Sequence, residues 1–385
     1  MRVGIIGLGY RLGYLGHVFH EICPDFRIVG YVDPAPAGME TLQKHGISAG
    51  KAHETPEDLI RAGGFDLLMI GSPNHLHLDH IRLGLEAGLK VFSEKPIVAS
   101  LEQTYALAGL LGKFGHDRLT VGLVLRYAPL YRDLLKARDD GLLGKLLSIE
   151  AAEHIYPYHG AFFMRDWRRY EKWSGSFMLE KCCHDLDLYN GLIGARPERV
   201  ASFGGRKNFI PANDPRTYGV NDMSMYHRKP TGWNGSDKVF DTDADIIDYQ
   251  VAIIEYANGV GMNFHTNLNA PDQFRRFAAF GTRGQAEGDF IRGFFKVTDV
   301  LTEQRVMEKE YRATALSQHY GADEEMAAGI VDYAMKGIVQ PVSTLDALEA
   351  GILAFAMDDA RRTKQVVDLR PIWDRYDNAF HTKAA

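Results

Sequence analysis

Hydrophobic positions from residue 2 to about residue 120 are grouped into short apolar runs that alternate with helix-like stretches. The runs cover residues 3–6, 27–32, 67–70, 90–92 and 119–124. Apolar strands separated by amphipathic helices indicate a parallel sheet that is covered by helices on both faces. The pattern therefore predicts an α/β fold with an N-terminal, Rossmann-type parallel sheet over residues 1–122.

A different pattern follows in the rest of the chain. Residues 246–268 alternate apolar with polar side chains and carry Asn258-Gly259 near their middle, a pair that favours a tight hairpin turn. Further strand-like runs lie at residues 276–280 and 294–300. We therefore expect residues 123–385 to form a second, α+β domain with a mostly antiparallel sheet.

Two segments of this second domain depart from the strand pattern. Residues 204–245 are polar, rich in glycine, proline, asparagine and aromatic residues, and longer than most loops. Such an irregular insertion is a substrate lid, a subunit contact or a disordered segment, and the pattern leaves these alternatives open. Closer to the C-terminus, Ser343 and Asp346 fit a capping box for a helix to about residue 364, and a strand is expected at residues 366–369.

Composition narrows the class of protein. Of the 385 residues, 45% are hydrophobic and 24% charged, as in soluble globular proteins. The formal net charge of −6 offers no basic surface for nucleic acid or an anionic membrane. The three cysteines are an odd, sparse set that indicates a reducing compartment, so we expect a cytoplasmic protein. The apolar run at residues 3–6 is too short for a signal peptide or a membrane span.

A glycine-rich loop lies between the first predicted strand and the first predicted helix. It contains Gly7, Gly9 and Gly13, and the third glycine is one position later than the usual spacing. Glycines are needed where the backbone must approach a pyrophosphate at a helix N-terminus. The second strand ends in Asp33, whose carboxylate can accept hydrogen bonds from a ribose, and no arginine follows it, so NAD is preferred to NADP. The alternative is an ordinary glycine turn and a surface aspartate.

Polar residues also follow the next two predicted strands. Residues 72–77 follow one of them, and Glu94-Lys95-Pro96 follow the other. Ligands of open parallel sheets bind beyond the carboxyl ends of the strands. Lys95 is thus a candidate donor toward a substrate oxygen, the alternative being a surface lysine that pairs with Glu94.

A second candidate for chemistry lies at residues 177–187. If these residues form one helix, Glu180, His184 and Asp187 share a face. Oxidation of a secondary alcohol requires that its hydroxyl proton leave, and a histidine is a suitable acceptor. The alternative is a structural core histidine. A zinc site is set aside, because Cys182 and Cys183 point in different directions on a helix and have no partner pair.

Taken in order, these motifs resemble the Gfo/Idh/MocA oxidoreductase family, which includes glucose-fructose oxidoreductase and inositol dehydrogenases. The resemblance rests on the glycine loop with Asp33, Ser72-Pro73-Asn74 with His77, Glu94-Lys95-Pro96, Trp167-Arg168, residues 180–187 with Leu192-Ile193-Gly194, Thr282-Arg283-Gly284 and residues 319–323. It implies a dinucleotide-binding domain followed by a domain whose large, open sheet lines the substrate cleft and builds dimers or tetramers.

The resemblance also implies roles for individual residues. Lys95 and His184 are the expected catalytic pair, with Lys95 beside the nicotinamide and His184 as general acid and base. The expected cofactor-binding residues are Gly7, Gly9, Tyr10, Arg11, Leu12, Asp33, Ser72, Asn74, His77, Glu94, Lys95, Arg126, Trp167 and Arg168. The expected substrate-binding residues are Lys95, His154, Tyr156, Glu180 and His184.

Some of these assignments depart from the family pattern or rest on residue type alone. Glu180 replaces the usual aspartate, and Lys181-Cys182 replace a small residue and a glycine. His154 and Tyr156 offer hydroxyl-binding and ring-stacking groups, with ordinary sheet-edge aromatics as the alternative.

These features predict an NAD-dependent dehydrogenase that oxidises a secondary hydroxyl of a sugar, glycoside or inositol-like polyol, or reduces the ketone. Two alternative functions remain open. One is a redox-neutral enzyme with retained NAD, such as a glycosidase or epimerase, and the other is a non-catalytic NAD-binding sensor. The expected partner is a small sugar or polyol, with neither nucleic acid nor membrane, and the expected assembly is a homodimer or homotetramer.

Overall fold

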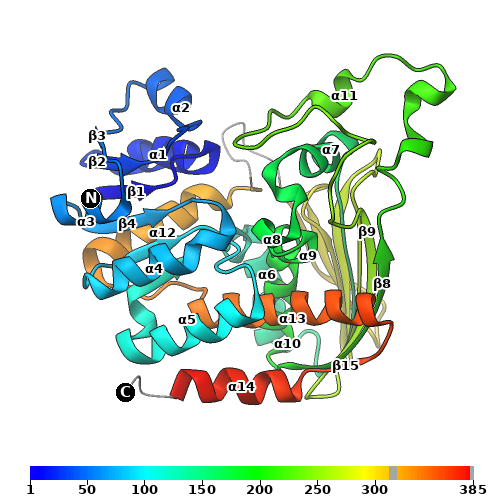
Figure 1. Cartoon of the computed structure of the whole chain (residues 1–385). Coiled ribbons are helices and arrows are strands. Elements are labelled where there is room, and N and C mark those ends of the chain that lie inside the picture. Colours follow the sequence, from blue (N-terminus) through cyan, green and yellow to red (C-terminus); the bar gives the residue numbers. More distant parts are fainter. Residues whose placement is uncertain (312–318, 382–385) are drawn as a thin grey trace. The chain divides into compact units, whose positions relative to one another are not determined.

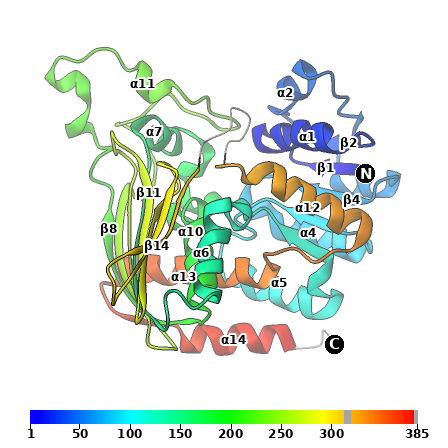
Figure 2. The ribbon, with the colours of Figure 1, turned by 180° about the vertical axis from the view of Figure 1, so that it is seen from behind.

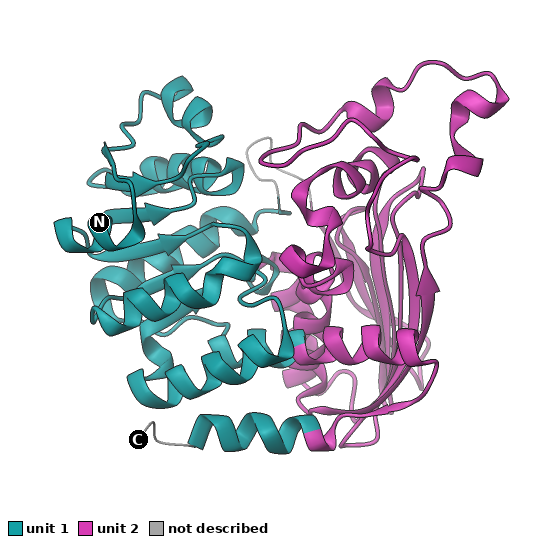
Figure 3. Ribbon diagram, in the orientation of Figure 1, with its two compact units in different colours: residues 1–127, 316–351, 372–385 teal, residues 128–315, 352–371 magenta. Residues whose placement is uncertain are grey.

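The computed structural model describes residues 1–311 and 319–381. The chain forms two compact units, drawn in two colours in Figure 3. Unit 1 consists of Met1–Tyr127, Leu316–Gly351 and Ile372–Ala385, and unit 2 consists of Ala128–Ala315 and Ile352–Pro371. The division expected from the sequence assigned all residues after 122 to the second domain, whereas these units give two C-terminal segments to unit 1.

Unit 1 contains the predicted parallel sheet. Its strands are ordered β3-β2-β1-β4-β5-β6, and every neighbouring pair is parallel. The strands are β1 (Arg2–Ile6), β2 (Arg27–Val32), β3 (Lys51–Ala52), β4 (Leu67–Ile70), β5 (Val91–Ser93) and β6 (Leu119–Val121). The Rossmann-type sheet is confirmed, and only the two-residue β3 at its edge lacked an apolar run in the sequence.

Helices lie on both faces of this sheet. The helices of unit 1 are α1 (Tyr10–Ile22), α2 (Met39–Lys44), α3 (Pro56–Ala62), α4 (His77–Glu86), α5 (Leu101–Phe114), α12 (Ala322–Lys336), the first half of α13 (Thr344–Thr363) and α14 (Arg370–His381), which lies against α5. Helices α4 and α5 lie in front of the sheet in Figure 1, and α12 lies in front of it in the reverse view of Figure 2. This double cover explains why β4 is apolar throughout, since all four of its residues are buried.

Helix α12 reaches unit 1 although it follows unit 2 in the sequence. It packs on α1, and its apolar residues Met326 and Ile330 are buried. Lys90 at the start of β5 donates to the carbonyl oxygens of Tyr333 and Ala334 at the end of α12. The burial of this apolar face is the physical reason that residues 322–336 belong with the N-terminal sheet.

Unit 2 contains a nine-stranded sheet with the order β14-β13-β12-β11-β7-β10-β9-β8-β15. The strands are β7 (Leu146–His154), β8 (Pro197–Gly205), β9 (Tyr249–Tyr256), β10 (Gly261–Asn267), β11 (Phe274–Gly281), β12 (Gly284–Asp289), β13 (Phe294–Asp299), β14 (Arg305–Glu310) and β15 (Val367–Asp368). One neighbouring pair, β7 with β10, is parallel, and the others are antiparallel. The mostly antiparallel sheet is confirmed, including the hairpin at Asn258-Gly259, where Gly259 has φ +81°.

One face of the large sheet packs on helices and the other is exposed. The helices of unit 2 are α6 (Pro129–Asp139), α7 (Pro157–Arg165), α8 (Glu171–Ser174), α9 (Phe177–Glu180), α10 (Cys183–Ile193), α11 (Ser224–His227) and the second half of α13 (Thr344–Thr363). Figures 1 and 2 both show α6 and α10 on the same side of the sheet. On the opposite face Phe203 and Ile253 are 64% and 69% exposed.

The insertion is ordered by contacts with its neighbours, within unit 2. It begins after Gly205, where β8 ends, and contains two short 3-10 turns and the four-residue helix α11. The buried carboxylate of Asp248 accepts hydrogen bonds from the backbone N–H groups of Lys207, Asn208 and Phe209. The insertion therefore has a defined conformation at its start.

The C-terminal helix prediction is confirmed. Ser343 and Asp346 bond reciprocally, each through its backbone N–H to the other's side-chain oxygen, and α13 begins at Thr344. The predicted strand after it is β15, which pairs with β8. In the described part of the chain, each helix is too short or too polar to span a lipid bilayer.

Candidate functional site

The glycine loop after β1 leaves room for a ligand at the N-terminus of α1. Gly7 has φ +85°, and a Cβ there would lie 2.3 Å from the backbone nitrogen of Ser72. Gly9 precedes the helix with no side-chain cap, and a Cβ on it would meet no atom within 4 Å. A bare helix N-terminus with open space above its glycine suits a pyrophosphate. The loop therefore fits the dinucleotide that the sequence predicts.

The displaced third glycine has a separate explanation. A Cβ on Gly13 would lie 2.6 Å from Cα of Gly38, so Gly13 allows α1 to pack closely against the turn before α2. Leu12 occupies the usual glycine position, is buried, and lies against Gly71, where a Cβ would be 2.6 Å from the Leu12 Cγ. The unusual spacing therefore reflects a different local packing of α1 and leaves the loop at Gly7 and Gly9 intact.

Asp33 follows β2 beside the loop. Its Oδ1 accepts a hydrogen bond from the backbone N–H of Ala35 at 2.7 Å. Burial raises the pKa of this carboxyl, against the opposing effect of hydrogen bonds from the backbone of Ala35 and Leu8. The position at the end of the second strand is that of a ribose-binding acid.

Arg11 connects the loop to two carboxylates of unit 1. Its Nε donates to Oε1 of Glu94 at 3.1 Å, and its Nη2 lies 2.8 Å from Oδ1 of Asp323. The third nitrogen, Nη1, is buried without a hydrogen-bond partner among the described residues. A buried donor at the phosphate loop is a second sign that the residues present fit a polar cofactor.

The contact between Arg11 and Asp323 favours the charged form of both side chains. Burial alone would raise the pKa of Asp323, but the hydrogen bond from His319 and the charge of Arg11 lower it to about 2. Burial likewise acts against the charge on Arg11, but Glu94 and Asp323 raise its pKa overall. The residues 319–323 were recognised only as a family landmark. Their contact with Arg11 could not be predicted, since more than 300 residues of sequence separate the two sides.

Glu94 also contacts the candidate catalytic lysine. The backbone N–H of Lys95 donates to Oε2 of Glu94 at 3.2 Å, while Oε1 accepts from Arg11. One carboxylate thus connects the helix of the phosphate loop to the backbone of Lys95. The side chain of Lys95 is partly exposed, as a group that meets a ligand must be.

His77 and Ser72 hold neighbouring strand ends together. The Nδ1 and Nε2 of His77 lie 2.8 Å from the carbonyl oxygens of Pro96 and Ser72, respectively. Ser72 Oγ lies 2.9 Å from Nδ1 of His80. Because both ring nitrogens of His77 contact protein carbonyls, this residue shapes the loops after β4 and β5. A direct contact of His77, Ser72 or the buried Asn74 with the cofactor stays a prediction.

In unit 2, the expected single helix carrying Glu180, His184 and Asp187 is wrong. Helix α9 ends at Glu180 and α10 begins at Cys183, so Lys181 and Cys182 interrupt it. The ammonium group of Lys181 lies 3.0 Å from Oε1 of Glu153 on β7, a contact that accompanies the interruption. Glu180 and His184 are nevertheless both buried.

Glu180 forms an ion pair with Arg168, in the 3-10 turn Trp167–Arg169. The Nε of Arg168 donates to Oε1 of Glu180 at 2.7 Å, and Nη1 donates to Oδ1 of Asp166 at 2.8 Å. Burial opposes the charge on Arg168, but Glu180 and Asp166 raise its pKa overall. The guanidinium also lies over the ring of Trp167, 4.3 Å from the ring centroid. Trp167-Arg168 thus lie beside Glu180 within one unit.

A buried charge cluster lies beside His184 in sequence and was missed by sequence reasoning. Arg275 of β11 contacts Glu153 at 2.6 Å and Asp185 at 2.9 Å, and all three residues are buried. Burial raises the pKa of Asp185, and the negative charge of Glu153 adds to this although Arg275 opposes it. The available signal was weak, because strand alternation places Glu153 and Arg275 on the covered face only once the register is known.

His154 lies on the opposite face of the sheet from Glu153. Its ring lies 4.6 Å from that of His265 and 4.4 Å from that of Phe274, centroid to centroid. Burial and the charge of His265 lower the pKa of His154 to about 4. The assignment of His154 to the substrate stays a prediction.

Two further predicted residues lie at helix starts. Tyr156 precedes α7, and its ring stacks on that of Tyr158 at 5.7 Å. Arg126 is in the 3-10 turn Val124–Tyr127 after β6 and is partly exposed. Neither observation identifies a ligand. The substrate-binding role of Tyr156 and the cofactor-binding role of Arg126 therefore stay predictions.

A cavity of about 370 Å³ lies within the insertion. It is lined by Arg216, Met223, His227, Asp237, Lys238, Val239 and Asp241. None of the residues that the sequence assigned to cofactor or substrate lines it.

The parallel sheet, the bare helix N-terminus and Asp33 define an NAD-binding oxidoreductase. Residues 1–122 match the family model described as "Oxidoreductase family, NAD-binding Rossmann fold", and residues 131–287 match the GFO/IDH/MocA C-terminal domain. The chain belongs to the Gfo/Idh/MocA family of oxidoreductases, which confirms the resemblance. It is an oxidoreductase whose N-terminal domain is of the NAD-binding Rossmann type.

Individual relatives are distant. The chain is 24% identical to YteT of Bacillus subtilis over 319 residues, which cover 73% of this chain and 74% of that protein. It is 29% identical to the scyllo-inositol 2-dehydrogenase (NAD(+)) of Bacillus subtilis over 210 residues, 53% of this chain and 57% of that enzyme. The latter match thus spans little more than half of either protein.

A solved structure extends the likeness of fold. The chain superimposes on levoglucosan dehydrogenase, solved with NADH and levoglucosan, with a TM-score of 0.76 over 96% of this chain and 99% of that one. The sequences are 17% identical. This likeness supports the fold alone.

Proposed function

We propose that this protein is an NAD-dependent dehydrogenase that oxidises a secondary hydroxyl of a sugar, glycoside or inositol-like polyol, or reduces the corresponding ketone. The observation that carries the proposal is the contact of Glu94 with both Arg11 and the backbone of Lys95. It connects the loop that suits a dinucleotide phosphate to a lysine just after β5. Relatives named for inositol oxidation support the substrate class.

The residues of this chain divide the work as follows. The backbone at Gly7 and Gly9 receives the pyrophosphate, and Asp33 accepts the ribose hydroxyls. Bound NAD supplies the acceptor for the hydride. Lys95 donates a hydrogen bond to the reacting oxygen, and His184 removes the hydroxyl proton when the alcohol is oxidised. Glu180, paired with Arg168, contacts other hydroxyls of the substrate.

The buried setting of His184 supports this division. The side chain is 4% exposed and follows directly on the α9–α10 interruption. A base in a site that excludes water transfers its proton to a positioned group and loses less to solvent. The interruption also places Glu180 and His184 on two different helices, so the proposed role of His184 does not depend on the predicted alignment with Glu180.

The open face of the large sheet is the surface through which we propose that copies of this chain associate. Phe203 and Ile253 are exposed there, and Val251 lies between them on β9. Contiguous exposed apolar side chains mark interaction surfaces, and most soluble oligomers are symmetric assemblies of one chain. A homodimer or homotetramer follows from this.

The decisive experiment is a screen of the purified full chain with NAD against inositols, free sugars and glycosides. NADH absorbance and the mass of the product are followed together. The proposal expects NADH and a product that has lost two hydrogens. A product formed without net NADH would instead establish redox-neutral chemistry with retained NAD. Tight NAD binding without turnover of any compound would establish a sensor.

A further inference from the structure

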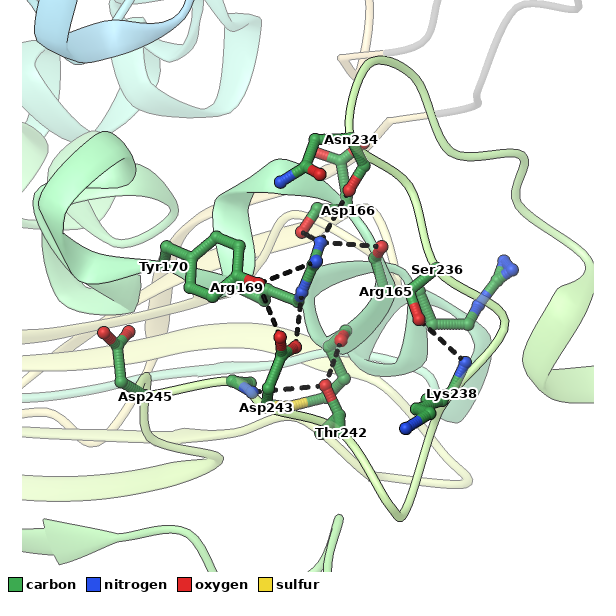
Figure 4. A network of polar contacts seen from close by, with 12 residues as sticks. Arg165, Asp166, Arg169, Tyr170, Asn234, Ser236, Lys238, Thr242, Asp243 and Asp245 are labelled. Carbon is green, nitrogen blue, oxygen red and sulfur yellow. Dashed lines mark hydrogen bonds and ion pairs between the residues drawn. The ribbon is translucent and has the colours of Figure 1, made fainter.

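The insertion is fastened to one short segment of unit 2, residues 164–171, which includes Trp167-Arg168. Figure 4 shows the bonds that hold it. Arg169 donates from Nε to Asp243 at 2.8 Å and from Nη1 to the carbonyl oxygen of Asn234 at 2.6 Å. The backbone N–H of Ser236 donates to the carbonyl oxygen of Arg165 at 2.8 Å. Residues 229–245 therefore form a strap over this segment.

More contacts of the strap involve the ends of α7 and the turn that follows. Arg165 donates from Nη2 to the carbonyl oxygen of Lys229 at 2.9 Å. Thr242 donates from its hydroxyl to the carbonyl oxygen of Met164 at 2.7 Å, and the backbone N–H of Asp245 donates to the carbonyl oxygen of Arg169 at 3.1 Å. These repeated hydrogen bonds fix the strap to α7 and to the turn that follows it.

Asp166 connects this strap to the ion pair of Arg168 and Glu180. Its side chain is 1% exposed, and its two oxygens have different partners. Oδ2 accepts from the backbone N–H of Gly232 in the strap at 3.1 Å, and Oδ1 accepts from Nη1 of Arg168 at 2.8 Å. Arg168 in turn donates from Nε to Glu180 at 2.7 Å. The contacts run without a gap from Gly232 to Glu180.

The strap holds Arg168 from a second side through an aromatic ring. The ammonium group of Lys229 lies 4.1 Å from the centroid of the Phe162 ring, and the guanidinium of Arg168 lies 5.6 Å from the same centroid. Arg168 keeps about a quarter of its side chain exposed, whereas Glu180 and Asp166 are buried. An arginine that is held by hydrogen bonds and is still partly exposed presents directed donors to a ligand.

We propose that the insertion determines substrate specificity, with Asp166 as the positioning residue that orients Arg168 against Glu180. The oriented pair offers a donor and an acceptor side by side, which suits two neighbouring hydroxyls of a polyol. Arg168 is thereby assigned to the substrate, in place of the cofactor-binding role that the resemblance implies. This inference rests on the proposed function, since Glu180 is assigned to the substrate there. It adds that residues 229–245 control the geometry of that acid.

The sharpest test compares two substitutions at one position of the strap. Gly232→Pro removes the N–H that Asp166 accepts, whereas Gly232→Ala keeps it. A Cβ is tolerated there, because its nearest atom would be Oδ2 of Asp166 at 3.9 Å, and the φ of Gly232 is not positive. The proline variant loses this hydrogen bond, fixes φ at residue 232 and restricts Thr231, whereas the alanine variant controls for the added Cβ alone.

We expect Gly232→Pro to raise the KM for the polyol found in the screen by about tenfold, with kcat and the KM for NAD within about twofold of the wild-type values. Gly232→Ala should match the wild type. Asp166→Asn should reproduce or exceed the effect of Gly232→Pro. Asp243→Asn weakens a different bond of the strap, the one from Arg169, and should leave the KM for the polyol unchanged. Equal KM values in the proline and alanine variants would overturn the proposal.

A measurement without turnover separates this inference from the proposed function. In protein with 15N-labelled arginine, the Nε–H signal of Arg168 is identified by its absence in Arg168→Lys. The signal should shift and exchange faster with water in Gly232→Pro and Asp166→Asn, and should remain in Gly232→Ala and Asp243→Asn. An Arg168 signal that is unchanged in the first two variants would refute the coupling, whatever the enzyme oxidises. A failed substrate screen with the expected signal changes would refute only the proposed function.

Discussion

Arg11 and Glu94 form an ion pair, with 3.1 Å between Nε and Oε1, that joins the phosphate-loop helix to the strand end carrying Lys95. Arg11 is a donor to Asp323 as well, and its Nη1 is buried at the loop. One guanidinium therefore serves two protein carboxylates and keeps one nitrogen without a hydrogen-bond partner among the described residues. This arrangement uses the planar fork of arginine and could not be made by a lysine.

Arg11→Lys is accordingly expected to weaken NAD binding. Loss of a hydrogen bond to a charged group costs about 1.5–3 kcal/mol, so the Kd for NAD should rise about tenfold to a hundredfold. Calorimetric titration of NAD into the purified variant measures it. Arg2→Lys is the control, because Arg2 pairs with Asp66 on the exposed side of the same sheet and should leave the Kd unchanged. An unaltered Kd in Arg11→Lys would show that Arg11 is structural only.

Lys95→Met and His184→Asn should separate chemistry from cofactor binding. Loss of a general acid or base reduces turnover by about a hundredfold to ten thousandfold. Both variants should show this loss in kcat. The Kd for NAD should change far less, because the glycine loop and Asp33, which are proposed to bind the pyrophosphate and the ribose, are unchanged. Rapid mixing and steady-state assays with the substrate from the screen give kcat. Near-normal turnover in either variant would remove that residue from the proposed mechanism.

The buried arginine of unit 2 predicts a large loss of stability. Arg275→Met leaves Glu153 and Asp185 buried without their cation, and breaking a buried pair in this way costs about 3–5 kcal/mol. Urea unfolding followed by circular dichroism measures the change. Arg292→Met is the control, since Arg292 pairs with Asp272 at the surface and its loss should cost at most about 1 kcal/mol. Equal stability of the two variants would contradict the buried cluster.

The exposed face of the large sheet predicts a change of assembly. Ile253→Asp puts a charge beside Phe203 and Val251 and should dissociate the oligomer into smaller species. Light scattering after size exclusion gives the mass. Leu301→Asp is the control, because Leu301 is 92% exposed in the turn after β13 and lies off the face. An oligomer of unchanged mass in Ile253→Asp would show that the copies do not associate through this face of the sheet.

The parallel sheet and the hairpin at Asn258-Gly259 were predictable because both are recorded locally, as apolar runs and as a turn pair. The placement of α12 in unit 1 was not, because the helix pattern of residues 322–336 carries no information on which sheet it covers. The residues of the candidate site likewise fall into those that local sequence patterns indicate and those that they do not. Asp33 and Lys95 follow strands and could be found from spacing, whereas Asp323 and Arg275 act on residues that lie far away in the sequence.

The interruption between α9 and α10 shows a further limit. Residues 177–187 have good helical spacing, yet the chain leaves the helix at Lys181, whose ammonium group pairs with Glu153 of β7. The insertion, residues 204–245, has little periodicity in its hydrophobic positions. Its order comes from side chains such as Arg169 and Asp166, whose partners lie about 70 residues later, and pairwise contacts of that kind are invisible in a single sequence.

His154 gives the last prediction, a pH dependence of stability. Its pKa is about 4 in the folded protein, because of burial and the charge of the neighbouring His265, with Glu153 opposing and Arg276 adding to the shift. In the unfolded chain a histidine has a pKa near 6.5. Below pH 6.5 the unfolded chain therefore takes up a proton that the folded protein does not, so stability is complete above pH 6.5 and falls as the pH approaches 4.

The expected size of this loss is up to about 3 kcal/mol, which is the free energy that corresponds to the difference between the two pKa values. His154→Gln removes the titration, so the wild type should lose more free energy of unfolding than the variant between pH 7 and 4, by up to that amount. His265→Gln, changed at the exposed partner, should keep most of the dependence. Unfolding curves at fixed protein concentration and several pH values provide the comparison, and parallel curves for wild type and His154→Gln would mean that His154 is solvated and lies outside the packed cluster with Phe274.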